Sequence, residues 1–543
     1  MTSTLAINIG ITGHRDIPKQ DSAKLESALM EELSKLKKQY SYSTINVLSG
    51  LAEGADQMMV KVALKLKLPV IAVLPFEVPE YEKDFDSEAS LAEFRYLLSL
   101  CSEVKICEID AKLPREHGYI ELGRTLVNCS DIIIALWDGL SKQNNQSHIS
   151  TTRPGGTADV VYMCVNGLID ETSLLFSKPN KTYCKWLLTN RLQHKQLPPT
   201  ISSLDKIATW QEIMFEGKQD EPFLNEILHK TERFNKEALH IDDSDIRTSA
   251  DYLLGSIQNE LDLTSIAKLV DAYCVADCLA QAKQKQRLVS LRSITTLSFF
   301  AIASQQIYVG LYTTIEWFLI HMLLVGLVIV IYRLFFMGTD SREEQFVEWR
   351  VFAEDLRVQI FWYIAGLPDH SAHNYRTTKL YEMDWIVDNL NKLMMHIQDP
   401  QSANIELVRE EWIIDQRNYF YGQRGERGRA AALMRKSKRI QRFSLACFGI
   451  AILLMVLSMF GIHYGLLAVF KSPVLFVVIA MAFITSALLK TYAVQMGYEE
   501  LSQRYLRTGY FFSQAMNRMA LLDKNQADDI EMYQKVIKTI GIE

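Results

Sequence analysis

The sequence predicts an N-terminal α/β domain with a mostly parallel sheet, followed by an all-α transmembrane region of two helical hairpins. Three observations lead to this prediction. Short apolar runs rich in β-branched residues alternate with helical patterns over residues 1–170. Four later apolar runs, each of about 20 residues, have the length of a membrane-spanning helix. These four runs come in two close pairs, and a close pair of spans is typical of a helical hairpin.

Composition agrees with a soluble part joined to a few spans. The chain has 543 residues, of which 48% are hydrophobic, and its mean hydropathy is +0.00. The net charge of −6 offers no general basic surface, so we expect no nucleic-acid partner. The spacing of the eight cysteines predicts neither a disulfide framework nor a metal site. We expect no cofactor and no cleavable signal peptide.

Five buried strands are expected in the N-terminal domain. Helical patterns, for example Ser22–Gln39 and Asp56–Lys67, separate most of the strand-like runs. Short buried strands that alternate with helices indicate a Rossmann-like sheet with helices on both faces. The expected strands are Ile7–Ile11, Ile45–Leu48, Val70–Leu74, Val104–Cys107 and Ile132–Leu136.

Four loops that follow strands or open helices carry the candidate binding residues. They are Gly10–Arg15, Ser49–Asp56, Trp137–Gly139 and Arg153–Asp159. Ligands of open α/β sheets bind beyond the carboxyl ends of the strands, where glycines let backbone N–H groups approach a phosphate. We therefore predict a nucleotide-type ligand there. The candidate residues are Gly10, Thr12, Gly13, His14, Arg15, Ser49, Gly50, Glu53, Gly54, Trp137, Asp138, Gly155, Gly156 and Thr157.

Several of these residues have a second interpretation. Arg15 suits a phosphate clamp, but it could also pair with Asp16. His14 could contact a base or ribose, or could be a loop histidine with internal partners. Trp137 could stack on a base or fill the edge of the sheet.

Two further residues stand where helices begin. Asp56 and Thr157 could each cap a helix, contact the ligand, or do both. We assign no catalytic residue and no metal ligand.

The membrane region is expected to have both termini in the cytosol. The predicted spans carry basic residues at their outer flanks, whereas the short link inside the first hairpin has no Lys or Arg. By the positive-inside rule this predicts a multi-pass protein of the cell inner membrane. The four expected spans are Ile294–Thr313, Trp317–Met337, Phe443–Tyr464 and Val474–Tyr492.

An internal repeat follows the two hairpins. Residues 348–365 resemble residues 499–515, and the pairs Leu356/Leu506, Arg357/Arg507, Phe361/Phe511 and Ala365/Ala515 align without gaps. A duplicated unit of basic helix, hairpin and amphipathic helix explains this, with chance similarity as the alternative. The expected divisions of the chain are 1–170 (ligand-binding domain), 171–265 (polar helical linker), 266–370 (coupling helix, first hairpin and amphipathic helix), 371–440 (cytosolic helical block) and 441–543 (second hairpin and amphipathic helix).

The motif set of the N-terminal domain resembles the SLOG superfamily of nucleotide-sensing Rossmann-like domains. The similarity covers about residues 5–170 and rests on Gly10–Arg15, Ser49–Asp56, Trp137–Gly139 and Pro154–Asp159. The C-terminal half, about residues 265–520, is similar to the SLATT type of pore-forming membrane module. SLOG domains include the Lonely Guy phosphoribohydrolases, whose glycine loop reads Pro-Gly-Gly-x-Gly-Thr with a catalytic Glu three residues later. Here the loop is the shorter Pro154–Thr157, and Val occupies position 160.

These resemblances imply a membrane effector in bacterial antiphage defence. A cytosolic domain would sense a nucleotide-derived second messenger, and the hairpins would form a pore or disrupt the membrane. A homo-oligomer is expected because four spans of this kind are too few to enclose a pore. The alternative is a membrane-tethered nucleotide N-glycosidase that uses Asp159, Asp138 or Glu53 as its acid-base group.

Overall fold

The chain folds into two compact units in a computed structural model. Unit 1 comprises residues 1–242, 263–275 and 370–398, and unit 2 comprises residues 243–262, 276–369 and 399–543. The structure describes residues 5–109, 112–140, 155–167, 182–192, 206–211, 221–255, 264–311, 314–336, 342–371, 384–397, 400, 403–423, 428–464, 472–522 and 527–542.

A seven-stranded sheet forms the centre of unit 1. The strand order is β4-β3-β2-β1-β5-β6-β7, and every neighbouring pair is parallel except β6 and β7. All five expected strands are present, so the predicted parallel α/β fold of this region is confirmed. The strands are β1 (Ala6–Gly13), β2 (Thr44–Ser49), β3 (Val70–Leu74), β4 (Glu103–Ile106), β5 (Ile132–Trp137), β6 (Tyr183–Leu188) and β7 (Trp210–Gln211).

The sheet is larger than the sequence indicated, because β6 and β7 come from residues 171–265, which we expected to be a polar linker. Strand β6 contains Lys185, which breaks its apolar run. The side chain of Lys185 is neutralised by Glu32 of α1 (Lys19–Gln39), far away in the sequence. Because the charge of Lys185 is neutralised by a residue distant in the sequence, the hydropathy pattern of residues 183–188 alone does not indicate a buried strand.

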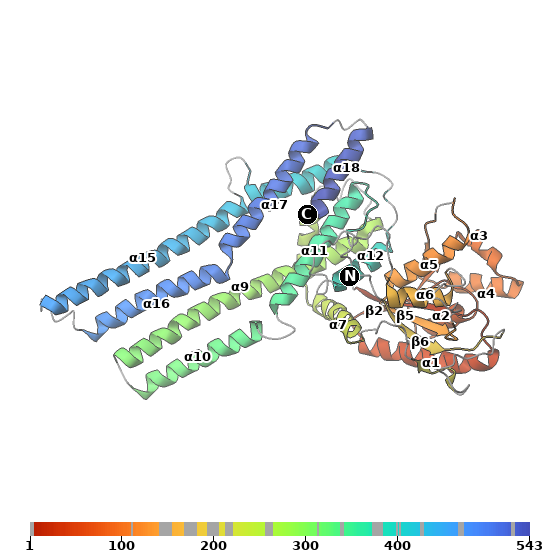
Figure 1. Ribbon diagram of the computed structural model, residues 1–543, viewed down its shortest axis with the longest axis horizontal. Helices are drawn as coiled ribbons and strands as arrows, with labels where there is room; N and C mark the ends of the chain where they lie inside the picture. The colour runs from red at the N-terminus through yellow and green to blue at the C-terminus, as the bar shows by residue number, and fades with distance from the viewer. Residues whose placement is uncertain are drawn as a thin grey trace, which may run out of the picture. The chain divides into compact units, whose positions relative to one another are not determined.

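Two hydrophobic clusters cover the two faces of the sheet. One contains Ile7, Ile9 and Ile11 of β1, and the other contains Ile133 and Ala135 of β5. Such burial on both faces explains why the strands are continuous apolar runs. The covering helices are α1, α2 (Ala55–Lys65), α3 (Val78–Tyr81), α4 (Glu88–Ser99) and α7 (Glu221–Ala238) with the first cluster, and α5 (Glu116–Cys129) and α6 (Thr157–Asn166) with the second (Figure 1).

Helix α12 (Asp384–Met394) also belongs to unit 1, although its sequence lies between the two hairpins. Its Lys392 reaches the beginning of β5, where Nζ lies 2.9 Å from Oδ1 of Asp131, and donates a hydrogen bond of 2.9 Å to the carbonyl of Ala6. Both charged side chains are almost fully buried. The expected cytosolic block 371–440 is therefore divided between the two units.

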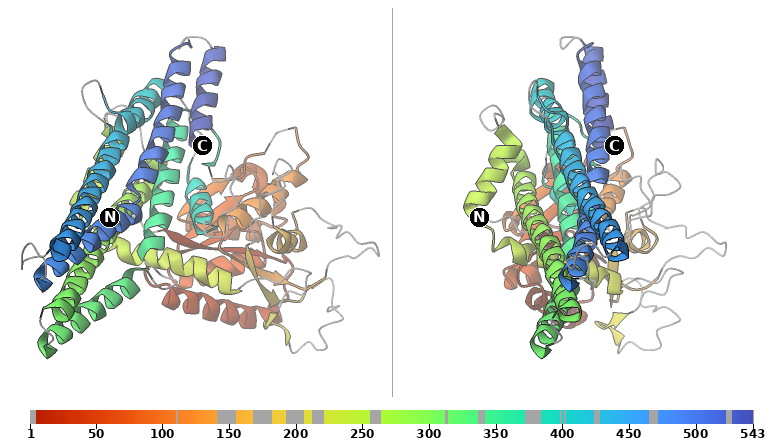
Figure 2. Two further views of the ribbon diagram at one scale, coloured as in Figure 1. Left: turned by 60° about the vertical axis from the view of Figure 1, so that its left-hand side comes forward. Right: turned by 90° about the vertical axis from the view of Figure 1, so that its left-hand side faces the viewer.

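Unit 2 is helical. Helix α9 (Ala267–Gly310) begins in unit 1 and is continuous into the first hairpin, as expected for a helix that leads into a membrane. The other helices are α8 (Asp243–Leu254), α10 (Ile315–Phe336), α11 (Arg342–Ile364), α13 (Ile405–Val408), the π-helical η7 (Arg409–Ile414), α14 (Asp415–Tyr421), α15 (Arg429–Tyr464), α16 (Pro473–Gln495), α17 (Tyr498–Met519) and α18 (Ala527–Ile542) (Figures 1 and 2).

Three stretches are long and apolar enough to cross a membrane, which indicates a membrane protein. They are Ile315–Leu334, Arg429–Gly461 and Pro473–Met519 within the described residues. The expected span Ile294–Thr313, which lies mostly in α9, is not among them. Its apolar run is diluted by serines, threonines and the adjacent Gln305 and Gln306.

Both hairpins have direct contacts between their helices. In the first, His321 of α10 donates a hydrogen bond of 2.9 Å to the carbonyl of Ala301 in α9. In the second, Ser444 of α15 donates a hydrogen bond of 2.8 Å to the carbonyl of Ser486 in α16. Hydrogen bonds and close approach hold helices together where there is no water to drive their association.

Helices α11 and α17, which carry the repeat, differ in their surroundings. Leu356 and Phe361 of α11 are buried, and Phe361 stacks on Trp412 at a centroid distance of 5.1 Å. The aligned Leu506 and Phe511 of α17 are 40% and 47% exposed. The two copies of the repeat therefore present the same sequence positions to different environments.

Candidate functional site

The strand order creates one topological switch point at the centre of the sheet. From β1 the chain builds outward through β2, β3 and β4, and it then returns to place β5 on the other side of β1. The loops after β1 and β5 therefore diverge at the carboxyl edge, where open α/β sheets bind their ligands. Three of the four predicted loops, those after β1, β2 and β5, leave the sheet at this edge.

The loops after β1 and β2 pack directly on each other. The N–H of Ala55 donates a hydrogen bond of 3.1 Å to the carbonyl of His14. Gly54 has φ +78°, and a Cβ on it would lie 2.5 Å from the carbonyl oxygens of His14 and Arg15. Gly13 faces Ala55 with the same lack of space. These glycines are needed so that the two loops can meet, and this seats the start of α2 against the end of β1.

His14 and Asp138 form a buried pair across the switch point. Nε2 of His14 lies 3.2 Å from Oδ1 of Asp138 and accepts a hydrogen bond of 2.9 Å from its backbone N–H. Although burial by itself raises the pKa of Asp138, the hydrogen bond and charge of His14 bring it below its usual range. Nε2 cannot offer a lone pair to the backbone and a proton to the carboxylate at once. The pair therefore has two alternative hydrogen-bonding arrangements.

Arg15 is an exposed residue that directly follows His14 in the loop after β1. Its neighbour Asp16 is bound by Arg191, with 2.9 Å between Nε and Oδ1. The alternative in which Asp16 neutralises Arg15 is thus disfavoured. Positive charge at this position lowers the pKa of Asp56 nearby. Arg15 therefore remains a candidate for the predicted phosphate contact.

Asp56, for which the sequence left open a helix cap or a ligand contact, lies next to these loops. Its carboxylate is buried beneath the loop after β2, and Oδ2 accepts a hydrogen bond of 3.4 Å from the N–H of Ala52. Burial raises the pKa of Asp56 to about 7, against the lowering effects of hydrogen bonds from Ala52 and Gly50 and of the Arg15 charge. Carboxyl groups with a pKa raised in this way are frequent at functional sites, although buried carboxyl groups elsewhere can show the same shift. In the sequence, the only indication of a role for Asp56 was its position at the end of the glycine loop Ser49–Asp56.

Other candidates in the loop after β2 are held by the protein. Oγ of Ser49 accepts a hydrogen bond of 3.0 Å from the N–H of Leu51. The carbonyl of Gly50 accepts one of 2.9 Å from the hydroxyl of Tyr81. Glu53 is hydrogen-bonded to Ser90 of α4. These contacts fix the shape of the loop before any ligand arrives.

Besides Gly13 and Ser49, which end β1 and β2, three further candidates lie inside strands. Gly10 packs against Ile133, so it serves the contact between β1 and β5. Thr12 is buried within β1. Trp137 is buried in the core with its ring 5.4 Å from that of Trp186. This burial favours the interpretation of Trp137 as a filler of the sheet edge over stacking on a base.

The fourth loop opens α6. Gly155 has φ +73°, and a Cβ there would lie 2.5 Å from the backbone of Tyr119 in α5. Its N–H donates a hydrogen bond of 2.8 Å to Oδ2 of Asp159, and Gly156 and Thr157 begin the helix. Asp159 therefore closes the turn. Pro154 and Arg153 lie outside the described residues.

Next to this loop lies a cluster that sequence patterns did not reveal. Arg115 lies 4.4 Å from the ring centre of Phe76, which follows β3. It also pairs with Asp84 at 2.8 Å and donates a hydrogen bond of 2.9 Å to the hydroxyl of Tyr119. These residues come from separate segments of the chain, so their spacing in the sequence does not predict that they meet. Arg115 adds a second, partly exposed cation to the carboxyl edge.

The edge therefore combines fixed backbone turns, two arginines and a protonatable carboxyl group, a combination that can bind an anion with a polar body. No group of His, Cys, Asp and Glu suited to a metal ion occurs in the part of the chain that the structure describes. Neither a protein-family model nor a curated protein matches this chain.

Proposed function

We propose that this protein is a membrane effector whose α/β unit binds a nucleotide-derived signal and thereby opens a pore or disrupts the bilayer. The observation that carries the proposal is the meeting of the β1, β2 and β5 loops at the switch point, with Arg15 exposed beside the buried Asp56 and the pair His14–Asp138. The setting of bacterial antiphage defence follows only from the resemblance to SLOG and SLATT proteins.

The chain offers a physical route from this site to the membrane helices. Helix α12 is fixed to the amino end of β1 and β5 by Lys392, whereas its sequence connects the two hairpins. A ligand that binds one arrangement of the sheet more tightly also favours one position of α12. Differential affinity of this kind, typically about 1–3 kcal/mol, is sufficient for allosteric control.

The proposed topology has four spans, with α9 completing the first hairpin. Contacts between α9 and α10 support it, as does the ring contact of Tyr308 with Phe318 at 5.8 Å. Both termini would face the cytosol of the cell inner membrane, and several copies would assemble around a pore.

Thermal unfolding and liposome flux of the full-length chain test the sensor together. With a panel of cyclic and linear nucleotides, the active compound should stabilise the protein by about 2.7 kcal/mol at 100 times its dissociation constant. It should also start dye efflux. Arg15→Ala should abolish both effects, whereas Arg124→Ala, which removes an exposed arginine of α5 that pairs with Glu121, should leave them unchanged. A panel that gives neither a shift nor efflux contradicts the proposal.

A nucleotide N-glycosidase is the second candidate, and the raised pKa of Asp56 is the observation in its favour. The three acid-base groups considered from the sequence are engaged: Asp159 with Gly155, Asp138 with His14, and Glu53 with Ser90. Release of free base from nucleoside monophosphates, lost in Asp56→Asn, would favour this candidate over the sensor.

A further inference from the structure

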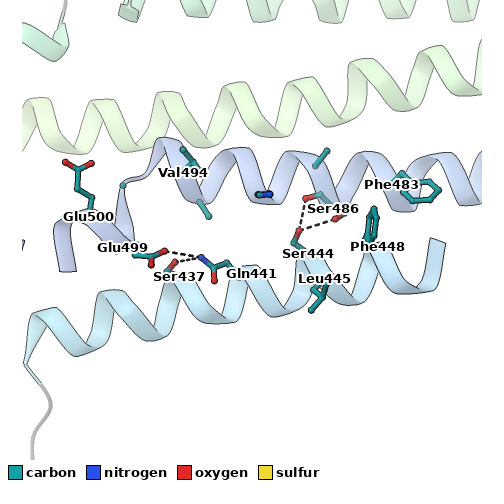
Figure 3. A pocket seen from close by; sticks show the side chains of 14 residues that line it. Ser437, Gln441, Ser444, Leu445, Phe448, Phe483, Ser486, Val494, Glu499 and Glu500 are labelled. Atoms are coloured by element: carbon teal, nitrogen blue, oxygen red, sulfur yellow. Dashed lines mark hydrogen bonds between the residues drawn. The ribbon is translucent and has the colours of Figure 1, made fainter. Parts of the chain in front are cut away.

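A groove runs between α15 and α16 in the second hairpin. Its volume is about 920 Å³. On both α15 and α16, the lining residues are spaced mostly three or four apart, so each helix lines the groove with one face. Several lining side chains are small, so the helices meet at Ser444 and Ser486 without filling the space beside them (Figure 3). The lining residues used below are Gln441, Leu445, Ala487, Lys490 and Glu499.

The groove has an apolar end and a charged end. Figure 3 shows Phe448 facing Phe483 at the apolar end, with a ring distance of 5.5 Å. At the other end, Gln441 donates a hydrogen bond of 3.4 Å to the carboxylate of Glu499. Lys490 lies between the two ends, and no ion pair of Lys490 occurs within the described ranges. The charged end coincides with the basic flank of both spans.

The order of charges matches a lipid headgroup. Lys490 precedes Gly497 by about 10 Å of helix, so it lies deeper than Glu499, and its long side chain can extend toward the surface. In a phospholipid that carries an ammonium group, the phosphate likewise lies deeper than the ammonium. Phosphate would meet Lys490 and ammonium would meet Glu499, while one acyl chain would occupy the apolar end.

A helix from a second copy fits the groove less well. At the corresponding ends of α10 and α15, the charged side chains nearest the apolar run are Arg333 and Arg442. Each would place a positive charge near Lys490, and like charges repel most strongly where little water screens them. A space of this size in hydrocarbon does not stay empty, and a lipid supplies both the apolar chain and the missing anion.

We infer that the groove between α15 and α16 is a binding site for a phospholipid with a phosphate and a primary ammonium in its headgroup, as in phosphatidylethanolamine. The inference rests on insertion of α15 and α16 into a bilayer and is independent of nucleotide sensing. It assigns Lys490 to the phosphate, Glu499 to the ammonium and the stretch from Leu445 to Phe448 to the acyl chain.

Native mass spectrometry of the delipidated full-length chain tests this site. With an equimolar mixture of phosphatidylethanolamine, phosphatidylcholine and phosphatidylglycerol, we expect the phosphatidylethanolamine adduct to dominate. Lys490→Glu should weaken that adduct by about tenfold, the usual effect of losing a charged hydrogen-bond partner. Arg442→Glu makes the same charge change outside the groove lining and should have little effect. Ala487→Trp should reduce binding of all three lipids by filling the space.

Equal losses in Lys490→Glu and Arg442→Glu, or no preference among the lipids, would overturn the inference. A photoreactive benzophenone in place of Leu445 gives an independent result, because it should attach to lipid and not to a second chain. A covalent dimer would assign the groove to another copy. If the chain binds none of the lipids and also fails to float with liposomes, both this site and the membrane insertion on which it rests are overturned.

Discussion

At the scale of single residues, the site depends on groups whose burial gives them unusual properties. Asp56 is held below a loop that Gly54 and Tyr81 shape, and it has little contact with water. His14 and Asp138 are equally shielded and share one nitrogen between two contacts. Such groups respond strongly to a nearby charge because little solvent screens it. A phosphate beside Arg15 would therefore alter the protonation of its neighbours.

The raised pKa of Asp56 predicts a pH dependence of stability. The folded chain keeps the Asp56 proton up to about pH 7, whereas the unfolded chain releases it near the ordinary aspartate pKa of 3.8. Stability is therefore lost as pH rises between these two values, by on the order of 4 kcal/mol for a shift of this size. Asp56→Asn removes this loss, so its melting temperature should exceed that of the wild type at pH 8.

The comparison between the two proteins at low pH provides the control. At pH 4 Asp56 is protonated and uncharged in the folded state, so Asp56→Asn should melt within a few degrees of the wild type. Equal melting temperatures of the two proteins at pH 8 would show that Asp56 is not kept neutral by burial. The measurement is thermal unfolding of the full-length chain in detergent, followed across this pH range.

At the scale of elements, the most informative feature is the attachment of α12 to the sheet. Lys392 pairs with Asp131, which also accepts a hydrogen bond of 2.8 Å from the N–H of Asn8. A second contact, between His396 and Glu103 at 2.8 Å, extends the attachment to β4. A buried pair of this kind gives little net stability but fixes one arrangement, because other arrangements leave charge buried and unpaired.

Breaking the α12 attachment should uncouple binding from efflux. Lys392→Met leaves Asp131 buried without its cation and should cost about 3–5 kcal/mol of stability. Ligand binding at the opposite edge of the sheet should persist while ligand-induced efflux falls. Lys268→Met breaks the exposed pair with Glu103, with about 0–1 kcal/mol expected, and serves as the matched control. Wild-type efflux from a folded Lys392→Met chain would exclude α12 as the coupling element.

At the scale of the whole molecule, the arrangement joins a ligand-binding type of sheet to helices that suit a bilayer. Three stretches meet the length and hydropathy of spans, whereas the expected span in α9 does not because it contains more polar residues. A polar span is favourable in a bilayer when its polar side chains face other helices or a water-filled path. Whether α9 crosses the membrane as the fourth span is therefore a prediction that needs its own test.

The position of α9 can be determined by labelling from outside the cell. If α9 and α10 both span the membrane, Thr314→Cys in their link should react with a membrane-impermeant maleimide in intact cells. Gln286→Cys, before the span, should react only after permeabilisation. Labelling of Thr314→Cys that also requires permeabilisation would place the link in the cytosol and contradict the four-span topology.

The sequence alone determined the elements whose signal is local. Strands β1 to β5 and the long apolar helices were predictable because burial on both faces, or immersion in lipid, demands continuous apolar runs of characteristic length. The glycine loops were also predictable, because glycine is the residue that fits where two backbone segments come close together. The resemblance to SLOG domains rested on these loops.

Only the tertiary structure decided which of these parts meet, and what their chemistry becomes. His14 reaches Asp138 across 124 residues and Lys392 reaches Asp131 across 261, while β6 depends on the pairing of Lys185 with Glu32. The high pKa of Asp56 depends on what covers it. Pairing and burial are properties of the assembled fold, because desolvation and charge act through space, and no spacing along the chain encodes them.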